Sequence, residues 1–508
     1  MASETSPKVE RTTIAGSIEI PRILNGLWQL AGGHDRDIDV AIAAEGMAPL
    51  IDAGLDGFDM ADHYGPAELV IGQHNRTSDR PITAFTKWCP PENGDKSFEN
   101  AEVAVNLALK RMNQTQIALM QYHVWDYTDD TYLCNLAHLR TLQQQGKIAH
   151  IGLTNVDAAH LELLIHSGHD IATNQVSCSV IDLRLVRGRM FSVCEKHGVG
   201  ILTYGTLLGG FLSEKWVDVP EPRDVRGLNW SLQKYLRFIR AAGGWAAFQH
   251  VLKAVATVAR KHGVSIAAVA MRWVLDIPVV KAVIIGARLT KESGVYAASK
   301  LAVFGFSLDD DDRALIAKAQ EMLKDLPGDC GDEYRRPPFL TAAGDLSDHI
   351  KESDEMREVE DAIAAGKRVE YHSGSKWEPI CGYSRAVRTG RVIRVSGTTA
   401  NPPPQLAGQL EVVGGKSARS QAVAALDIIE RAIRRLGGTM SDVVRTRVML
   451  QREEDVDEVS EAHGWVFNCH GIWPANTLTT AGLIGDEILV EIEVEAEVGS
   501  GNSILAIS

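Results

Sequence analysis

The chain has 508 residues, too many for one ordinary domain, so two domains are expected. Its hydrophobic content of 45% is normal for a protein with globular cores. The net charge of -14 argues against a nucleic-acid-binding surface, because such a surface needs a basic patch.

The chain also offers nothing that favours a membrane or an oxidising compartment. The N-terminus, Met1 to Lys8, has no apolar stretch of the kind that a signal peptide needs. No run approaches the roughly 18 consecutive apolar residues of a membrane helix. The seven cysteines are scattered and form no Cys-x-x-Cys pair, so we expect reduced thiols, a cytoplasmic location and no metal site.

Short apolar segments alternate with longer amphipathic segments between about residues 23 and 303. The predicted strands are Ile23–Leu30, Gly57–Asp62, Ile82–Trp88, Ile117–His123, Ile151–Asn155, Ile171–Val176, Gly200–Tyr204 and Ala282–Gly286. Such a series of strand–helix repeats predicts an α/β fold, the (β/α)8 TIM barrel.

Four residues at or just after the ends of consecutive predicted strands carry the chemistry: Asp59, Tyr64, Lys87 and His123. Tyrosine has a reference pKa near 10, but a lysine ammonium beside it lowers that pKa, and an aspartate keeps the lysine charged and aimed. A histidine can hydrogen-bond a carbonyl oxygen where negative charge develops. Gathered at one barrel rim, these groups can reduce a carbonyl, with the hydride supplied by a cofactor.

The residues around these four strengthen the prediction, because one Tyr or His alone at a strand end usually only packs. Three segments resemble the aldo-keto reductase family, and the resemblance extends over about residues 10–325. They are Asp59-Met-Ala-Asp-His-Tyr64-Gly65, Thr86-Lys87-Trp88 and Gln121-Tyr122-His123. The resemblance implies NADP(H) as cofactor and a small-molecule carbonyl as substrate.

The same resemblance assigns residues near the nicotinamide. Thr154, Asn155 and Gln175 match family positions that hold the carboxamide. Tyr204 matches a ring that stacks on the nicotinamide, although Gly-Thr follows it where the family has Ser-Pro. Trp28 matches a position near the cofactor, and a packing role is an equal alternative.

At the last predicted strand, Gly286 and Arg288 resemble the family segment that meets the adenosine 2′-phosphate. A guanidinium suits a phosphate because it can bind two oxygens at once. The following residues, Glu292 to Tyr296, depart from the family's adenine-binding pattern. We therefore expect a preference for NADPH on the strength of Arg288.

One loop of the predicted barrel is unusually long, from Thr206 to about Ala242 before the next clear helix. It carries Trp216, Trp230 and Tyr235. Long loops at the top of a barrel are normally functional. Two alternatives stay open for these aromatic residues: packing of the loop onto the barrel, or lining of the substrate pocket.

The predicted domains are the barrel at 1–326, a linker with a charged helix at 327–370, and a second domain at 371–508. The second domain shows a strand at 391–397, a helix at 420–436, a strand at 443–450, a helix at 455–467 and a strand at 489–498. This order predicts a small α+β domain.

Several short segments of the second domain resemble the Rid (YjgF-like) family, formerly called endoribonuclease L-PSP, over about residues 370–500. They are Gly382-Tyr383-Ser384-Arg-Ala386-Val387, Val395-Ser-Gly397-Thr-Thr, Gly437-Gly438-Thr-Met-Ser-Asp442-Val443-Val444, Pro474-Ala475 and Val490-Glu491-Ile492-Glu493. The resemblance implies a chorismate-mutase-like fold and trimers with ligand clefts between subunits. In active members it also implies hydrolysis of imines.

Tyr383 and Glu491 match positions of that cleft, but Asn476 stands where active members have an arginine that holds the substrate carboxylate. We therefore predict an NADP-dependent reductase whose second domain serves as a trimerisation or ligand-binding module. The alternative is a bifunctional enzyme, in which the second domain hydrolyses an imine and the barrel reduces the released carbonyl.

Overall fold

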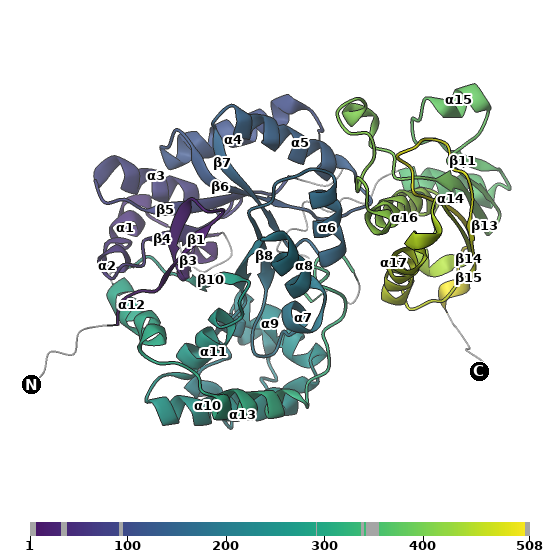
Figure 1. Cartoon of the computed structure of the whole chain (residues 1–508). Helices are drawn as coiled ribbons and strands as arrows, with labels where there is room; N and C mark the ends of the chain where they lie inside the picture. The colour runs from purple at the N-terminus through teal and green to yellow at the C-terminus, as the bar shows by residue number, and fades with distance from the viewer. Residues whose placement is uncertain are drawn as a thin grey trace, which may run out of the picture.

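The computed structural model describes residues 7–31, 38–90, 95–290, 292–336, 340–341 and 355–502. An eight-stranded closed barrel and a smaller six-stranded sheet domain lie side by side (Figure 1). The predicted TIM barrel followed by a small α+β domain is therefore confirmed. Residues 337–339 and 342–354 of the predicted linker lie outside the described residues.

All eight predicted barrel strands are present, and each pairs in parallel with the next until the last closes on the first. They are β3 (Ile23–Gly26), β4 (Gly57–Asp59), β5 (Thr83–Trp88), β6 (Ile117–His123), β7 (Ile148–Thr154), β8 (Thr173–Ser177), β9 (Gly200–Tyr204) and β10 (Val280–Gly286). A hairpin precedes them, β1 (Arg11–Ile14) and β2 (Ile18–Pro21). Its Ile14 and Ile20 join inward side chains such as Leu24 and Phe85 in one apolar cluster.

Helices surround the barrel and bury their apolar faces against it (Figure 1). The longer ones are α3 (Ala67–Thr77), α4 (Phe98–Met112), α5 (Thr131–Gln144), α6 (Ala158–His166), α8 (Met190–His197), α10 (Gly244–His262), α11 (Ile266–Leu275), α12 (Ser293–Leu301) and α13 (Asp310–Gln320). The connection between β3 and β4 contains two short helices, α1 (Val40–Glu45) and α2 (Ala48–Asp52). Gly46 ends the first, and Pro49 stands in the first turn of the second, where its missing N–H costs nothing.

The long loop after β9 contains a helix that the sequence analysis missed, α9 (Trp230–Ala241). The side chain of Asn229 caps its first turn by accepting a hydrogen bond from the Leu232 N–H. Trp216 packs its ring against Phe211 and Trp245, which supports the packing alternative for this residue.

The C-terminal sheet has the strand order β11-β12-β13-β16-β14-β15. The strands are β11 (Val369–Tyr371), β12 (Ala386–Thr389), β13 (Val392–Thr398), β14 (Val443–Leu450), β15 (Ala475–Thr480) and β16 (Val490–Glu497). The sequence analysis found β13, β14 and β16 but missed the other three strands. The two longer helices, α16 (Ala418–Arg435) and α17 (Val456–Cys469), cover the face that points toward the barrel (Figure 1).

Two short helices, α14 (Glu355–Ala364) and α15 (Trp377–Cys381), complete this part of the chain. The domain boundaries at 326 and 371 stay predictions. No helix in the described ranges has the length and apolar character needed to cross a membrane.

Candidate active site

A buried ion pair lies at the carboxyl ends of β4 and β5. Lys87 Nζ donates to Asp59 Oδ2 at 2.5 Å and to the carbonyl oxygen of Met60 at 2.8 Å. Both charged side chains are 2–3% exposed. A buried charge needs a partner and further hydrogen bonds, and this pair provides both.

Two glutamine amides complete the hydrogen bonding of Asp59. Its Oδ1 accepts from Gln121 Nε2 at 2.8 Å and from Gln175 Nε2 at 2.9 Å. Gln175, predicted to contact the nicotinamide, thus also supports the carboxylate. The role of Gln121 was missed, although its place two residues before His123 on β6 puts both side chains on one face of the strand.

Tyr64 follows β4 in the next loop, and Lys87 Nζ lies 5.2 Å from the centre of its ring. Trp28 contacts the same ring edge-on, with the two ring centres 4.9 Å apart. His63 also contacts it edge-on, with the ring centres 4.8 Å apart. The indole of Trp28 therefore fixes Tyr64 over the lysine, so the structure gives Trp28 a packing contact at the predicted site.

His123 stands at the end of β6 with its ring stacked on Trp125 at 3.6 Å. Its Nε2 lies 3.0 Å from Asn155 Nδ2. Tyr334, from the segment that follows α13, contacts the imidazole edge-on, with the two ring centres 5.4 Å apart. These three contacts set the plane of the ring at the same rim as the ion pair.

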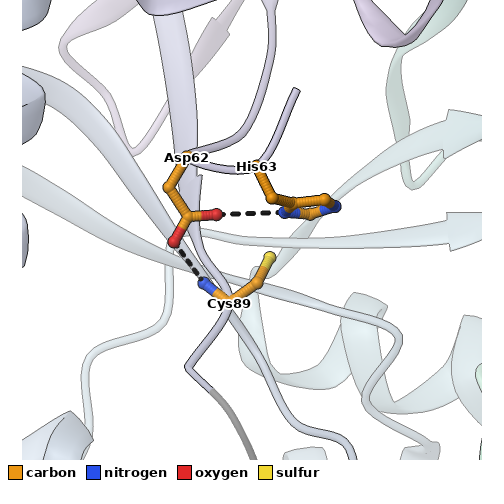
Figure 2. A group of neighbouring side chains, drawn as sticks. All are labelled: Asp62, His63 and Cys89. Carbon is orange, nitrogen blue, oxygen red and sulfur yellow. Dashed lines mark hydrogen bonds and ion pairs between the residues drawn. The ribbon is translucent and has the colours of Figure 1, made fainter. Parts of the chain in front are cut away.

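Figure 2 shows a second cluster beside Tyr64, in which the Asp62 carboxylate lies between the His63 ring and the backbone of Cys89. Asp62 Oδ1 is 3.0 Å from His63 Nδ1, and its Oδ2 accepts from the Cys89 N–H at 3.0 Å. The possible metal-ligand atoms of the three residues lie within 4.8 Å of one another. Burial and the Asp62 charge raise the pKa of the Cys89 thiol. The two contacts of Asp62 tie the loop that carries Tyr64 to the end of β5.

The residues predicted to hold the nicotinamide lie together at the ends of β7, β8 and β9. Thr154 Oγ1 is buried and makes no hydrogen bond among the described residues. The Tyr204 hydroxyl lies 2.7 Å from Asn155 Oδ1 and 2.9 Å from Glu333 Oε1. Burial and the Glu333 charge raise the pKa of Tyr204, so its hydroxyl stays a donor. A buried hydroxyl without a partner beside an amide fits the polar carboxamide of a nicotinamide.

Residues 329–336 pack on this rim, although the sequence analysis assigned them to a linker. Glu333 Oε2 accepts from Arg184 Nη1 at 2.6 Å, and both side chains are buried. Arg335 Nη1 donates to the Asn155 carbonyl at 2.5 Å. Gly331 approaches that carbonyl so closely that a Cβ would lie 2.0 Å from it, at a φ of +89°. No hydrophobic period marks this segment, so its sequence gave little sign of the docking.

The predicted 2′-phosphate residues stand at the end of β10. Gly286 is the last residue of the strand, and the Gln29 side chain lies where a Cβ would otherwise be. Arg288 follows two residues later and is exposed. An exposed guanidinium at this rim is open to a phosphate from solvent.

In the C-terminal domain, the predicted cleft residues do not all meet. The Tyr383 hydroxyl accepts from Arg385 Nη2 at 3.4 Å, and the Glu491 carboxylate lies against Gly397. Burial and the Glu493 charge raise the pKa of Glu491. Asn476 is on the edge strand β15, where its Oδ1 accepts from Thr446 Oγ1 at 3.0 Å.

Comparison with known proteins finds one family for the barrel and another for the C-terminal domain. The aldo/keto reductase family model matches residues 22–321, and the endoribonuclease L-PSP model matches residues 374–498. The barrel rim is thus that of an oxidoreductase acting on small carbonyl compounds with a nicotinamide cofactor. The chain belongs to the aldo/keto reductase family and also carries a Rid-type domain.

Three similar proteins illustrate this result. Flagellar radial spoke protein 5 of Chlamydomonas reinhardtii is 37% identical over 141 residues, which are 27% of this chain and 26% of that protein. Aldo-keto reductase YhdN of Bacillus subtilis is 25% identical over 65% of this chain and 98% of its own. The glycerol dehydrogenase structure from Gluconobacter oxydans has a TM-score of 0.51 and 22% identity, over 65% of this chain and 98% of that one. This structural likeness shows the fold alone.

Proposed function

We propose that the chain is an NADPH-dependent aldo-keto reductase that converts an aldehyde or ketone to an alcohol. The observation that carries the proposal is the buried Lys87–Asp59 pair beneath the Tyr64 ring. A fixed ammonium beside a phenol stabilises the phenolate, so Tyr64 is suited to give its proton to the substrate oxygen. His123, held by Asn155 and Trp125, orients the carbonyl by a hydrogen bond.

The cofactor residues support the same proposal. When bound, NADPH supplies the hydride that reaches the carbonyl carbon. Thr154, Asn155 and Gln175 would hold the carboxamide, and the Tyr204 ring would lie against the nicotinamide. Arg288 would pair with the 2′-phosphate, which distinguishes NADPH from NADH.

The test is a screen of aldehydes and ketones with the full chain, followed by NADPH absorbance. Tyr64→Phe should lower turnover by about 10²–10⁴-fold, the usual contribution of general acid catalysis, and leave NADPH binding unchanged. Tyr371→Phe, on β11 of the C-terminal domain, is the matched control. Wild-type turnover in Tyr64→Phe would reject the proton-donor role.

We further propose that the Rid-type domain serves as a trimerisation or ligand-binding module. Within the part of the chain that the structure describes, the sheet face opposite α16 is uncovered and carries the ion pairs of Arg447 with Glu493 and Glu495. A subunit interface on this face would therefore include charged side chains. Light scattering on the full chain decides the oligomeric state, and a monomer at micromolar concentration would reject the trimer.

A further inference from the structure

A cavity of about 520 Å³ lies between the barrel and the C-terminal domain. This is an ordinary size for a small-molecule site. The barrel contributes Tyr127, Asp130, Tyr132 and Leu133, and the other domain contributes α16 with the loops at 373–377 and 399–413. The predicted Rid cleft residues are not among those that line it. The cavity is therefore separate from the reductase site, whereas Arg385 in its wall also contacts Tyr383 of the predicted Rid cleft.

Most charges in the cavity wall already have partners. Arg431 Nη1 is 2.8 Å from Asp130 Oδ2, and Asp427 Oδ2 is 3.0 Å from His160 Nε2. A third acid, Glu411, is exposed at the rim. The paired groups stiffen the junction between the domains and leave little net charge for a ligand.

Arg385 is the buried charge in this wall for which the described residues offer no ion pair. It is 8% exposed and donates only to uncharged oxygens. Its Nη1 donates to the Gly397 carbonyl at 2.7 Å, Thr398 Oγ1 at 2.9 Å and the Ser396 carbonyl at 3.5 Å, and its Nη2 donates to the Tyr383 hydroxyl at 3.4 Å. No carboxylate of the described residues forms an ion pair with it, and its Nε is buried without a hydrogen-bond partner. Glu491 interacts electrostatically with Arg385, but the two charged groups lie beyond ion-pair distance. A buried guanidinium without a counter-charge is costly, and an entering anion would relieve that cost.

The rest of the wall is apolar or aromatic. Tyr127 and Tyr132 are buried on the barrel side, and Leu410 and Val413 face them from the other domain. Lys376 adds a second cation at an exposed position of the wall. Small hydrated ions such as phosphate gain nothing from such walls, whereas an organic acid uses both features.

We propose that this interdomain cavity binds a small organic monocarboxylate with an aromatic or branched apolar body. Its carboxylate lies on Arg385, and its body lies between the two tyrosines and the loop at 402–413. The site goes beyond the proposed reductase and Rid functions, because it needs residues of both domains. It uses none of the catalytic tetrad, by which we mean Asp59, Tyr64, Lys87 and His123.

The test uses the full chain and phenylacetate as the probe, with binding followed by calorimetry. Phenylacetate has no aldehyde or ketone to reduce, so the measurement is independent of turnover. One saturable site is expected. Phenylacetamide, which lacks the charge, and acetate, which lacks the ring, should each bind at least about tenfold more weakly.

Two variants place the site. Arg385→Met should weaken phenylacetate binding by about tenfold to a hundredfold, whereas Arg226→Met at an exposed site of the barrel should leave it unchanged. Because Arg385 also holds the Gly397 carbonyl, Ala407→Trp serves as a second test. Ala407 is exposed at the cavity wall, so a large ring there closes the cavity without touching Arg385.

Loss of binding in folded Arg385→Met supports the proposal, and if that variant does not fold, loss in Ala407→Trp decides in its favour. No saturable binding below about 10 mM phenylacetate overturns the proposal. Undiminished binding in the folded variants overturns it as well, because the anion then lies elsewhere, for example at the tetrad.

Discussion

The barrel rim and the junction between the two domains both bury charged side chains, but they assemble them differently. At the rim, Asp59 and Lys87 come from neighbouring strands, and barrel closure alone brings them together. At the junction, His160 of α6 lies 2.9 Å from Asp157 in its own chain segment and 3.0 Å from Asp427 of α16. The second contact joins residues 267 positions apart.

The difference separates two kinds of buried network. A network on consecutive strand ends is a property of the barrel, so it exists whenever the barrel closes. A network across a domain junction exists only when two folded units dock, and its charges then help to hold them. Single substitutions at the rim, at the junction and between them test this contrast.

Replacing Lys87 tests the rim network. Lys87→Met leaves the Asp59 charge buried with only two amide donors, so it should lower the free energy of unfolding by about 3–5 kcal/mol. Lys147→Met is the matched control, because the Lys147–Glu102 pair is partly exposed and worth about 0–1 kcal/mol. Urea unfolding of both variants measures the difference. An equal loss of unfolding free energy in the two variants would show that Asp59 does not depend on Lys87 as its counter-charge.

The junction network predicts a pH dependence. Burial alone would lower the pKa of His160, but the charges of Asp157 and Asp427 raise it to about 9. Burial also raises the pKa of Asp427, yet Asp157 remains as a second carboxylate and keeps the imidazolium charged. A raised histidine pKa gives stability that is complete below about pH 6.5 and disappears as the pH rises through about 9.

His160→Gln should therefore cost about 3 kcal/mol near pH 6 and much less above pH 9. The measurement is the free energy of unfolding at several pH values, with the exposed His250→Gln as the control. A wild-type profile that is as flat as that of His160→Gln between pH 6.5 and 9 would show that the junction does not depend on this charge.

Arg288 tests a solvent-facing part of the rim. If it pairs with the 2′-phosphate, Arg288→Ala should weaken NADPH binding by about 1.5–3 kcal/mol, the usual contribution of a hydrogen bond to a charged group. NADH lacks that phosphate and is the internal control. Fluorescence titration with both coenzymes measures the change, and equal losses would place the 2′-phosphate contact elsewhere.

Replacing Glu333 tests the role of residues 329–336, the segment that connects the barrel rim to the domain junction. Glu333→Gln removes one of two buried carboxylates from Arg184, which keeps Asp182 at 2.7 Å, so we expect a loss of only about 1–3 kcal/mol. The same variant should weaken nicotinamide binding, because Tyr204 loses a partner that fixes its hydroxyl. Glu321→Gln, on an exposed site, is the control. Unchanged coenzyme affinity would separate residues 329–336 from the cofactor site.

Much of the fold could be predicted because short-range patterns encode it. Apolar strands alternating with amphipathic helices identified all eight barrel strands, with end points that differ by only a few residues. Helix α9 was missed although Leu232, Tyr235, Leu236 and Ile239 follow a helical spacing, because the segment was treated as one long loop and Asn229 was not recognised as its cap. In the C-terminal sheet, β11 and β12 are too short for alternation to be visible, and β15 is largely exposed.

Local sequence patterns were enough to predict the strands of the barrel and the positions of the four tetrad residues at the strand ends. A side chain at the end of a parallel strand has one place to go once the barrel closes, and the residue types then define the chemistry. Tertiary packing alone brings Glu333, Tyr334 and Arg335 to the same rim and leaves Arg385, beside a cavity, without an ion pair among the described residues. These contacts depend on how distant segments dock, and no local period in the sequence reports the geometry of docking.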